Sequence, residues 1–337
     1  MGDGSMAISI KDVAKEADVS IATVSRVLND IDVVNDDTKK RVLDAIKDLG
    51  YRPNIVARSL KTQKTRTIGI IIPDISSQFY PEIVRGAEDV SNIYNYNIIL
   101  CNTDQDTEKE IEYLMVLREK MVDGVLYMSS SLEQGVIDTI NELQVPIVLI
   151  ETEDKEKLFP SVTIDNEKAS YDAVTYLIEK GNSKIAYVGT SGDALNAGAI
   201  RYHGYKRALL EKNLKFDKDI IRFGGLKVKD GYESMNSIIS KCSVDAVFCG
   251  SDEIAIGAIN SLRDNNIKVP DDVDVVGFGN SYYSSIYYPK LTTMSEPTYD
   301  MGSVAMRMLI KIIDKKELEH KYYVLPHELI KRDSCKK

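Results

Sequence analysis

The apolar residues of this 337-residue chain follow two different patterns. Over residues 6–50 they recur at intervals of three and four, which is the spacing of amphipathic helices. From residue 67 onward, short and nearly continuous apolar runs alternate with amphipathic stretches, as they do where strands and helices alternate. The pattern therefore predicts a small all-α unit followed by a larger α/β region.

The small unit contains three predicted helices. One lies within residues 10–20, and a second spans residues 21–29 with Ser20 as its N-cap. The third runs from Thr38 to Leu49 and is closed by Gly50. Two short helices joined by a tight turn form a helix-turn-helix, whose second helix fits the major groove of DNA.

The second helix has one apolar face, formed by Val24, Val27 and Leu28, which we expect to pack inward. The outward-facing residues are Ile21, Ala22, Thr23, Ser25, Arg26 and Asn29. They mix a basic group with small hydroxyl groups, as DNA-reading helices do. A solvated face on any small helical bundle gives the same spacing, so the pattern alone leaves both interpretations open.

Residues 51–66 form a basic segment, with five Lys or Arg residues and no acidic one, in a chain whose net charge is −9. Residues 1–66 hold 12 basic and 10 acidic side chains, whereas the remainder holds 31 and 42, a net charge of −11. Because that acidity would repel nucleic acid, any DNA contact must be local. Asn54 could cap a helix over residues 55–60, but so short a helix needs packing partners, so we expect it to become ordered on DNA.

Seven apolar runs in the larger region are predicted strands: residues 67–73, 97–102, 124–129, 146–151, 185–190, 245–251 and 273–279. Such strands are covered on both faces, which predicts parallel sheets with right-handed crossovers, divided between two doubly wound lobes. Ligands of these sheets bind beyond the carboxyl ends of the strands. The candidate effector-cleft residues at these strand ends are Asp74, Phe79, Ser129, Asp252 and Asn280.

Catalysis, metal binding and membrane insertion find no support in the sequence. The three histidines accompany no nucleophile motif, and no phosphate-binding glycine loop is present. The four cysteines lack the paired spacing of a zinc site. No apolar run reaches membrane-spanning length, and we expect a cytoplasmic protein that is not an enzyme and has no cofactor.

The stretches SIKDVAKEADVSIATVSRVLN and TKKRVLDAIKDLGYRPNIVARSL resemble, almost position by position, the N-terminal signature of the LacI family of bacterial transcription regulators. The resemblance implies base contacts by Ile21, Ala22 and Arg26. It implies DNA-backbone contacts by Ser20, Thr23, Ser25, Asn29 and Asn54. It also implies that Leu60, flanked by Ala57 and Arg58, wedges into the minor groove at the centre of a palindromic operator bound by a homodimer.

The resemblance extends over the larger region and implies a periplasmic-binding-protein-like core. The domains it implies are a headpiece (6–52), a hinge helix or linker (53–66), an N-terminal lobe (67–165 and 295–327) and a C-terminal lobe (166–294 and 328–337). Relatives that respond to sugars or purines usually hold the effector with an arginine five residues before the glycine of a G-Y pair and with the aspartate of a G-F-D motif. Ala199 and Gly279 stand at these positions, although Arg201 lies nearby and could substitute.

The stretches at 71–90, 96–106 and above all 297–311 (PTYDMGSVAMRMLIK) resemble the catabolite control protein A subfamily, whose corepressor is the serine-phosphorylated phosphocarrier protein HPr. The resemblance implies an HPr docking surface formed by Tyr299, Asp300, Met301, Val304, Arg307 and Lys311. Arg307 and Lys311 are four residues apart on one helix face, and their guanidinium and ammonium groups suit a dianionic phosphate. We expect a repressor of carbon-catabolite genes; the alternative is a repressor with a sugar or sugar phosphate in the cleft.

Overall fold

A computed structural model describes residues 8–28, 34–51, 64–152, 154–191 and 196–336. The chain divides into two compact units, Met1–Thr65 and Arg66–Lys337. Within the described ranges, no helix has the length and apolar character needed to cross a membrane.

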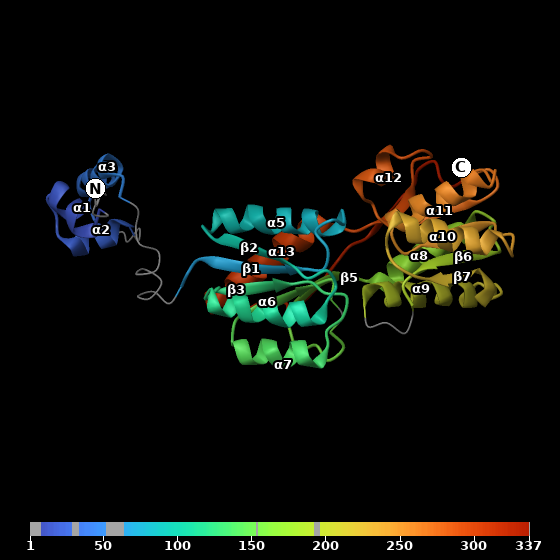
Figure 1. Cartoon of the computed structure of the whole chain (residues 1–337), viewed down its shortest axis with the longest axis horizontal. Coiled ribbons are helices and arrows are strands. Elements are labelled where there is room, and N and C mark those ends of the chain that lie inside the picture. The colour runs from blue at the N-terminus through green and yellow to red at the C-terminus, as the bar shows by residue number, and fades with distance from the viewer. Residues whose placement is uncertain (1–7, 29–33, 52–63, 153, 192–195, 337) are drawn as a thin grey trace, which may run out of the picture. The chain divides into compact units, whose positions relative to one another are not determined.

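The first unit contains the three helices α1 (Ile10–Glu16), α2 (Ile21–Leu28) and α3 (Asp36–Leu49) (Figure 1). Its core includes Val13, Val24 and Val42, all fully buried. Asp18 takes the left-handed conformation in the turn that ends α1, with φ of 50°. The predicted helix-turn-helix pair and third helix are therefore confirmed.

The third helix begins earlier than the prediction. It starts at Asp36 rather than Thr38, because the side chain of Asn35 accepts a hydrogen bond from the backbone N–H of Thr38 at 2.8 Å. This N-cap satisfies one of the free N–H groups of the first turn. At the other end, Gly50 is left-handed, with φ of 63°, as a glycine C-cap requires.

The N-terminal lobe of the second unit is a sheet covered by helices on both faces. The sheet order is β11-β5-β4-β3-β1-β2, and all of its pairings are parallel. Helices α5 and α13 pack together on one face, while α6 and α7 pack on the other (Figure 1). The elements are β1 (Thr67–Ile72), α5 (Phe79–Ile93), β2 (Asn97–Asn102), α6 (Thr107–Glu119), β3 (Gly124–Tyr127), α7 (Gln134–Leu143), β4 (Ile147–Ile150), β5 (Ser161–Ile164), α13 (Thr298–Ile313) and β11 (Tyr322–Leu325).

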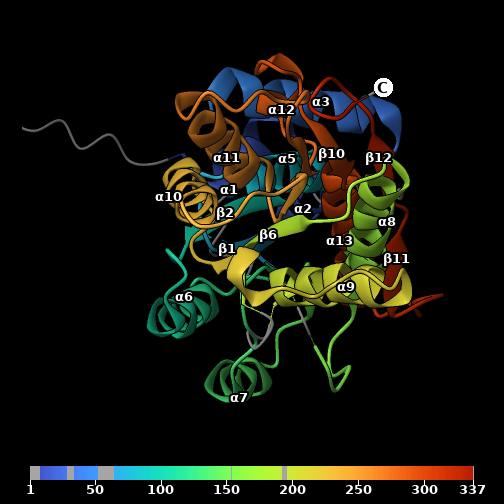
Figure 2. The same cartoon turned by 90° about the vertical axis from the view of Figure 1, so that its right-hand side faces the viewer.

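The C-terminal lobe repeats this design. Its sheet order is β12-β10-β9-β8-β6-β7, with only the pairing of β12 to β10 antiparallel among the described strands. Figure 2 shows α8 beside α9, and α10 beside α11. The elements are α8 (Asn166–Glu179), β6 (Ile185–Gly189), α9 (Ala197–Glu211), the 3₁₀ helix η1 (Lys218–Ile220), β7 (Ile221–Phe223), α10 (Val228–Ile239), β8 (Ala246–Cys249), α11 (Asp252–Asp264), β9 (Asp274–Gly279), α12 (Tyr282–Ile286), β10 (Thr292–Ser295) and β12 (Glu328–Ile330).

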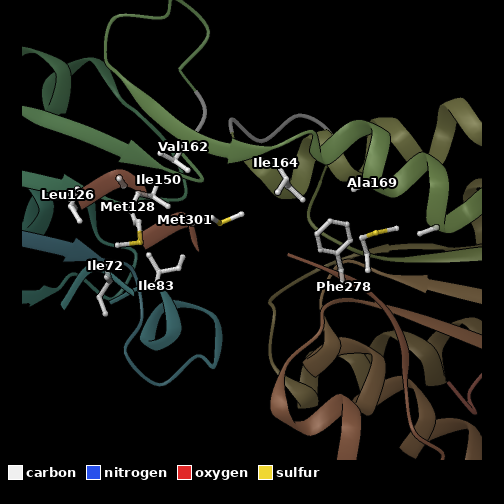
Figure 3. Packing of buried hydrophobic residues seen from close by; sticks show 14 of the residues in the cluster. Ile72, Ile83, Leu126, Met128, Ile150, Val162, Ile164, Ala169, Phe278 and Met301 are labelled. Atoms are coloured by element: carbon white, nitrogen blue, oxygen red, sulfur yellow. The ribbon is translucent and has the colours of Figure 1, made fainter. Parts of the chain in front are cut away.

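The two lobes share chain segments and a hydrophobic core. The chain passes between them after β5, between β10 and α13, and between β11 and β12. One cluster of buried residues continues from one lobe into the other. Figure 3 shows Ile164, at the end of β5, between Ile150 of the N-terminal lobe and Phe278 of the C-terminal lobe. The α/β core of two doubly wound lobes is as predicted, and all seven predicted strands are present.

Two glycines bring α5 and α13 into backbone contact. A Cβ atom at Gly86 would collide with the carbonyl oxygen of Tyr299, and one at Gly302 would collide with that of Ile83. Both glycines are buried. The absence of a side chain therefore lets the two helices approach more closely than ordinary ridge-and-groove packing allows. The exposed side chains of these two adjoining helices, among them Arg85, Tyr299 and Arg307, form what we call the α5–α13 surface.

Candidate nucleic-acid interface and partner-binding sites

The second helix of the first unit presents a small, partly polar face to solvent. Ile21 is 44% exposed, and Ala22 and Arg26 are exposed as well. Thr23 and Ser25 are half-buried, while Val24 and Val27 are buried against α1 and α3 and Leu28 packs beside them. The side chains that we predicted to face inward and outward on α2 are thus on the expected sides.

The start of α2 is held by Ser20. Its Oγ accepts a hydrogen bond from the backbone N–H of Thr23 at 3.1 Å and lies 2.9 Å from the Thr23 hydroxyl. The exposed helix start and its hydroxyl groups could meet a DNA phosphate. The remaining predicted DNA-binding residues, Asn29, Asn54, Ala57, Arg58 and Leu60, lie outside the described residues.

The outer surface of α13 carries most of the residues predicted to bind a protein partner. Tyr299 is 43% exposed, Asp300 and Arg307 are exposed, and Val304 and Lys311 are half-buried. Within the described residues, no ion pair involves Arg307. Lys311 lies 3.4 Å from Glu319 in an exposed pair that solvent weakens.

A depression of about 170 Å³ lies beside these two cations. Its lining residues are Val304, Arg307, Met308, Lys311, Leu318, Glu319 and Tyr323. Its lining combines apolar side chains with charged ones. This arrangement suits a protein side chain that carries a negative group at its tip.

The prediction for Met301 is wrong. Its side chain is fully buried in the core cluster, so it cannot contact a partner on this surface. Met301 lies about 120° around the α13 axis from Arg307, because six helical residues span about one and two-thirds turns. Met308 is also buried, at 3% exposure, and reaches the depression only at its edge.

Sequence reasoning missed the contribution of α5 to the same surface. The Tyr299 hydroxyl donates a hydrogen bond to Asp89 at 2.9 Å, and Asp89 lies 3.6 Å from Arg85. The Arg85 side chain is 64% exposed. A glycine inside each helix can allow close packing, but only the structure shows that Gly86 and Gly302 lie where the two backbones meet.

The candidate cleft residues already have partners within the protein. Asp74 accepts hydrogen bonds from Ser76 at 2.8 and 2.6 Å, and the Ser129 hydroxyl donates to Glu110 at 2.6 Å. Phe79 packs edge to face on Tyr80. These three positions therefore offer few unsatisfied polar groups to a ligand.

The two candidates of the C-terminal lobe that follow β8 and β9 are similarly engaged. Asp252 accepts hydrogen bonds from the Thr293 hydroxyl at 2.5 Å and from the Ser281 N–H at 2.6 Å. The Oδ1 of Asn280 accepts one from Arg332 at 2.7 Å. Burial raises the pKa of Asp252, although these hydrogen bonds to its charged form oppose the shift. Its carboxyl group thus holds β10 and the start of α12 in place.

The structure shows where Arg201 lies, the residue that could substitute for the arginine expected at position 199. Ala199, at the expected arginine position, is buried on α9 with 3% exposure, whereas Arg201 extends between the lobes to Glu296 and Glu151. Arg201, and not residue 199, therefore supplies the guanidinium that α9 places between the lobes. No cluster of three or more His, Cys, Asp or Glu side chains suited to a metal occurs in the described part of the chain.

Comparison with known proteins matches this architecture. Residues 9–54 match the family model of bacterial regulatory proteins of the lacI family, and residues 174–335 match that of the periplasmic binding protein-like domain. The HTH-type transcriptional regulator RegA of Clostridium saccharobutylicum is 64% identical, covering 98% of this chain and 99% of the relative. Catabolite control protein A of Priestia megaterium is 42% identical, covering 98% and 100%.

Solved structures agree with the fold. The transcription regulator CcpA of Lactococcus lactis aligns with a TM-score of 0.76 and 36% identity, over 80% of this chain and 99% of that one. A lac repressor dimer bound to operator and an anti-inducer aligns with a TM-score of 0.87 over 97% and 98%, at 22% identity. The first unit carries the helix-turn-helix, the second the two-lobed core, and the relatives regulate transcription rather than catalyse reactions: this chain is a DNA-binding transcription regulator that belongs to the lacI family.

Proposed function

We propose that the protein acts in the cytoplasm as a homodimeric repressor of carbon-catabolite genes and binds a palindromic operator. In this proposal α2 lies in the major groove, with Ile21, Ala22 and Arg26 at the base edges and Ser20, Thr23 and Ser25 near phosphates. The exposure of Ile21, Ala22 and Arg26 beside the buried Val24 and Val27 supports this assignment. Two identical headpieces require two half-sites related by symmetry.

The hinge proposal concerns residues of the sequence that follow the headpiece. Leu60, with Ala57 and Arg58 beside it, is proposed to enter the minor groove and kink the central base step, while Asn54 contacts the backbone. Replacement of Leu60 by Ala should abolish operator bending, measured by fluorescence resonance energy transfer between labels at the operator ends. A variant that bends the operator as strongly as the parent protein rules out the wedge.

The corepressor proposal is that serine-phosphorylated HPr docks on the α5–α13 surface. The observation that carries it is the exposed Arg307 guanidinium, four residues before Lys311, beside a depression lined by apolar and charged side chains. A guanidinium and an ammonium group on one helix face bind a phosphate through charge-assisted hydrogen bonds. The 42% identity to a catabolite control protein A supports the same partner.

Corepressor and operator must affect each other equally. If phosphorylated HPr tightens operator binding by some factor, the operator tightens HPr binding by that factor. In this proposal the partner protein binds the α5–α13 surface of the N-terminal lobe while the headpiece binds DNA. HPr therefore needs no contact with DNA to act as a corepressor.

Fluorescence anisotropy of a labelled palindromic operator tests the proposal. The protein is titrated alone, with unmodified HPr and with serine-phosphorylated HPr, and only the phosphorylated form should tighten binding. The matched control for Arg307→Ala is Arg118→Ala, because Arg118 is also an exposed helical arginine but lies on α6. If phosphorylated HPr has no effect on the parent protein, it is not the corepressor.

A second candidate function is a repressor whose effector is a sugar or sugar phosphate in the cleft. It is favoured by the position of Arg201 between the lobes and by the similarity to a CelR–cellobiose complex, which aligns at 30% identity with a TM-score of 0.75. Calorimetry of the full chain with sugars in the absence of HPr separates the two functions. Only this second candidate predicts saturable heat.

A further inference from the structure

Each nitrogen of the Arg201 guanidinium already has a partner within the protein. Nε donates to Asn166 Oδ1 at 2.8 Å, Nη1 to the carbonyl oxygen of Gly250 at 3.1 Å, and Nη2 to Glu296 Oε1 at 2.8 Å. One guanidinium face stacks on Phe278, with 3.8 Å between the guanidinium carbon and the ring centroid. Only 13% of the side chain is exposed. Arg201 is therefore held by the protein at all three of its nitrogens and at one face.

Glu296 is the partner that stands where a ligand would be expected. It lies between β10 and α13, where the chain passes from one lobe to the other, and its side chain is 1% exposed. While Oε1 accepts the hydrogen bond from Arg201, Oε2 faces Gly279. A Cβ atom at residue 279 would lie 3.7 Å from this Oε2 and 3.9 Å from Asp252 Oδ2.

The glycine at position 279 and the glutamate at position 296 depend on each other. Gly279 has φ of 119°, a conformation that residues with side chains rarely adopt. An aspartate there would also bring a further carboxyl group against those of Glu296 and Asp252 in a region shielded from water. From the segment between β10 and α13, the carboxyl group of Glu296 thus reaches the space that the side chain of an aspartate at position 279 would approach.

We propose that Glu296 is a built-in occupant of the interlobe site: its carboxyl group takes the Arg201 guanidinium that a small anionic effector, such as a sugar phosphate, would otherwise use. A carboxyl group tethered to the chain competes with free ligand at a high effective concentration. It also joins Arg201 of α9 to the crossing segment without any bound molecule. The site therefore needs no small effector to connect the lobes.

The charges around Arg201 agree with this occupancy. Burial raises the pKa of Glu296 to about 8, with Arg201 opposing the shift and Glu151 and Asp252 adding to it. Glu151 lies 3.9 Å from Arg201 but is held by the Thr163 hydroxyl, the Ile164 N–H and the Asn166 amide. The guanidinium thus lies beside two carboxyl groups, in a buried region whose other acidic groups, Glu151 and Asp252, disfavour a further negative charge.

Rescue of a truncated side chain by acetate tests the proposal on the full-length protein. Glu296→Ala leaves a space beside Arg201 with the shape of a carboxylic acid, which acetate can fill. Acetate at a concentration well above its dissociation constant should raise the melting temperature of this variant by roughly 4 °C, because a ligand stabilises the state that binds it. Sodium chloride at the same ionic strength should leave the melting temperature unchanged.

Two matched variants make the rescue specific. Glu296→Gln keeps the site filled, so acetate should not stabilise it. Glu110→Ala removes another buried carboxyl group, one held by the hydroxyls of Tyr127 and Ser129 at 2.6 Å and not by a guanidinium, and should also show no rescue. If acetate stabilises Glu296→Ala no more than it stabilises these two variants, Arg201 offers no site and the proposal is wrong.

A second measurement uses the unaltered protein and does not depend on whether Glu296→Ala folds. Calorimetry with glucose 6-phosphate should give no saturable heat. Saturable heat that disappears in Arg201→Ala would show that a ligand reaches the guanidinium despite Glu296, and would overturn the proposal. Neither measurement involves HPr or DNA, so the result is independent of the corepressor proposal.

Discussion

Arg201 and Arg307 occupy opposite environments in the same two-lobed core. Arg201 lies between the lobes with every nitrogen bonded to the protein, whereas Arg307 is exposed on α13 and has no ion-pair partner among the described residues. A buried guanidinium whose bonds are all internal maintains structure, because releasing it would leave carboxyl groups unpaired. An exposed guanidinium contributes little to the stability of the protein and can bind a partner. The signal-receiving surface of this regulator is therefore expected outside the cleft.

Loss of Arg201 should have the largest effect. Arg201→Ala leaves the buried Glu296 and Glu151 without their guanidinium, and the unfolding free energy should fall by about 3–5 kcal/mol. Urea unfolding followed by circular dichroism measures this change. Arg307→Ala is the matched variant and should change stability by less than about 0.5 kcal/mol. Equal losses for the two arginines would remove the distinction between them.

The pH dependence of stability should identify the protonation state of the buried cluster. Because the pKa of Glu296 is raised to about 8 from its usual 4.5, the folded protein binds this proton more tightly than the unfolded chain does. The stability gained from that proton is complete below about pH 4.5 and is lost as the pH rises through about 8, with a slope near 1 kcal/mol per pH unit.

Unfolding measured from pH 5 to pH 9 on the parent protein and on Glu296→Gln isolates this effect. The difference between their unfolding free energies should fall with rising pH, since the other titrating groups are common to both proteins. The groups that face Glu296 are Arg201, Glu151 and Asp252. A difference that instead grows with pH would mean that Arg201 keeps Glu296 ionised.

Arg307, the exposed arginine of α13, should affect only the response of operator binding to HPr. Arg307→Ala should reduce the tightening of operator binding by serine-phosphorylated HPr by about 1.5–3 kcal/mol, the usual value of a hydrogen bond to a charged group. Binding in the absence of HPr should not change. Operator anisotropy with and without HPr measures both quantities. A full response in this variant would move the phosphate contact elsewhere on the α5–α13 surface.

The headpiece offers a third exposed arginine, with a different expected effect. Arg26→Ala should lower discrimination between operator and single-base variants by about 1–3 kcal/mol at one position of each half-site. Competition binding against a panel of altered operators measures it. A uniform loss of affinity across the panel would instead identify Arg26 as a phosphate contact.

Hydrophobicity alone located the most apolar strands, including the edge strand β2, but not five others at the lobe edges and crossings. The strands that the sequence did not predict are β5, β7, β10, β11 and β12. They are three or four residues long, and in β5 and β11 more buried positions alternate with less buried ones. Strand β10 is buried but begins with two threonines, whose hydroxyl groups are satisfied by Asp252 and by the Arg332 backbone N–H. A buried polar residue of this kind is recognised only when its partner is known.

Prediction of the sites was limited in the same way: local spacing indicated which side chains are exposed, but not which distant residues meet. Helical spacing correctly placed Ile21 and Arg26 outside and Val24 inside, because local periodicity determines which face of a short helix is buried. It could not reveal that Glu296 meets Arg201, since 95 residues separate them in the chain. Nor could it separate Met301 from Arg307 on α13, where both faces carry apolar side chains.

The backbone contact between α5 and α13 has a mechanical consequence. Gly86 and Gly302 leave no layer of side chains at their crossing that could deform, so a force applied to one helix is passed to the other with little loss. The first turn of α5 carries Tyr80, whose hydroxyl lies in the electric field of Arg201 and Glu296. Helix α13, for its part, begins two residues after Glu296. The two helices therefore move as one stiff unit that connects the outer surface of the N-terminal lobe with the junction of the lobes.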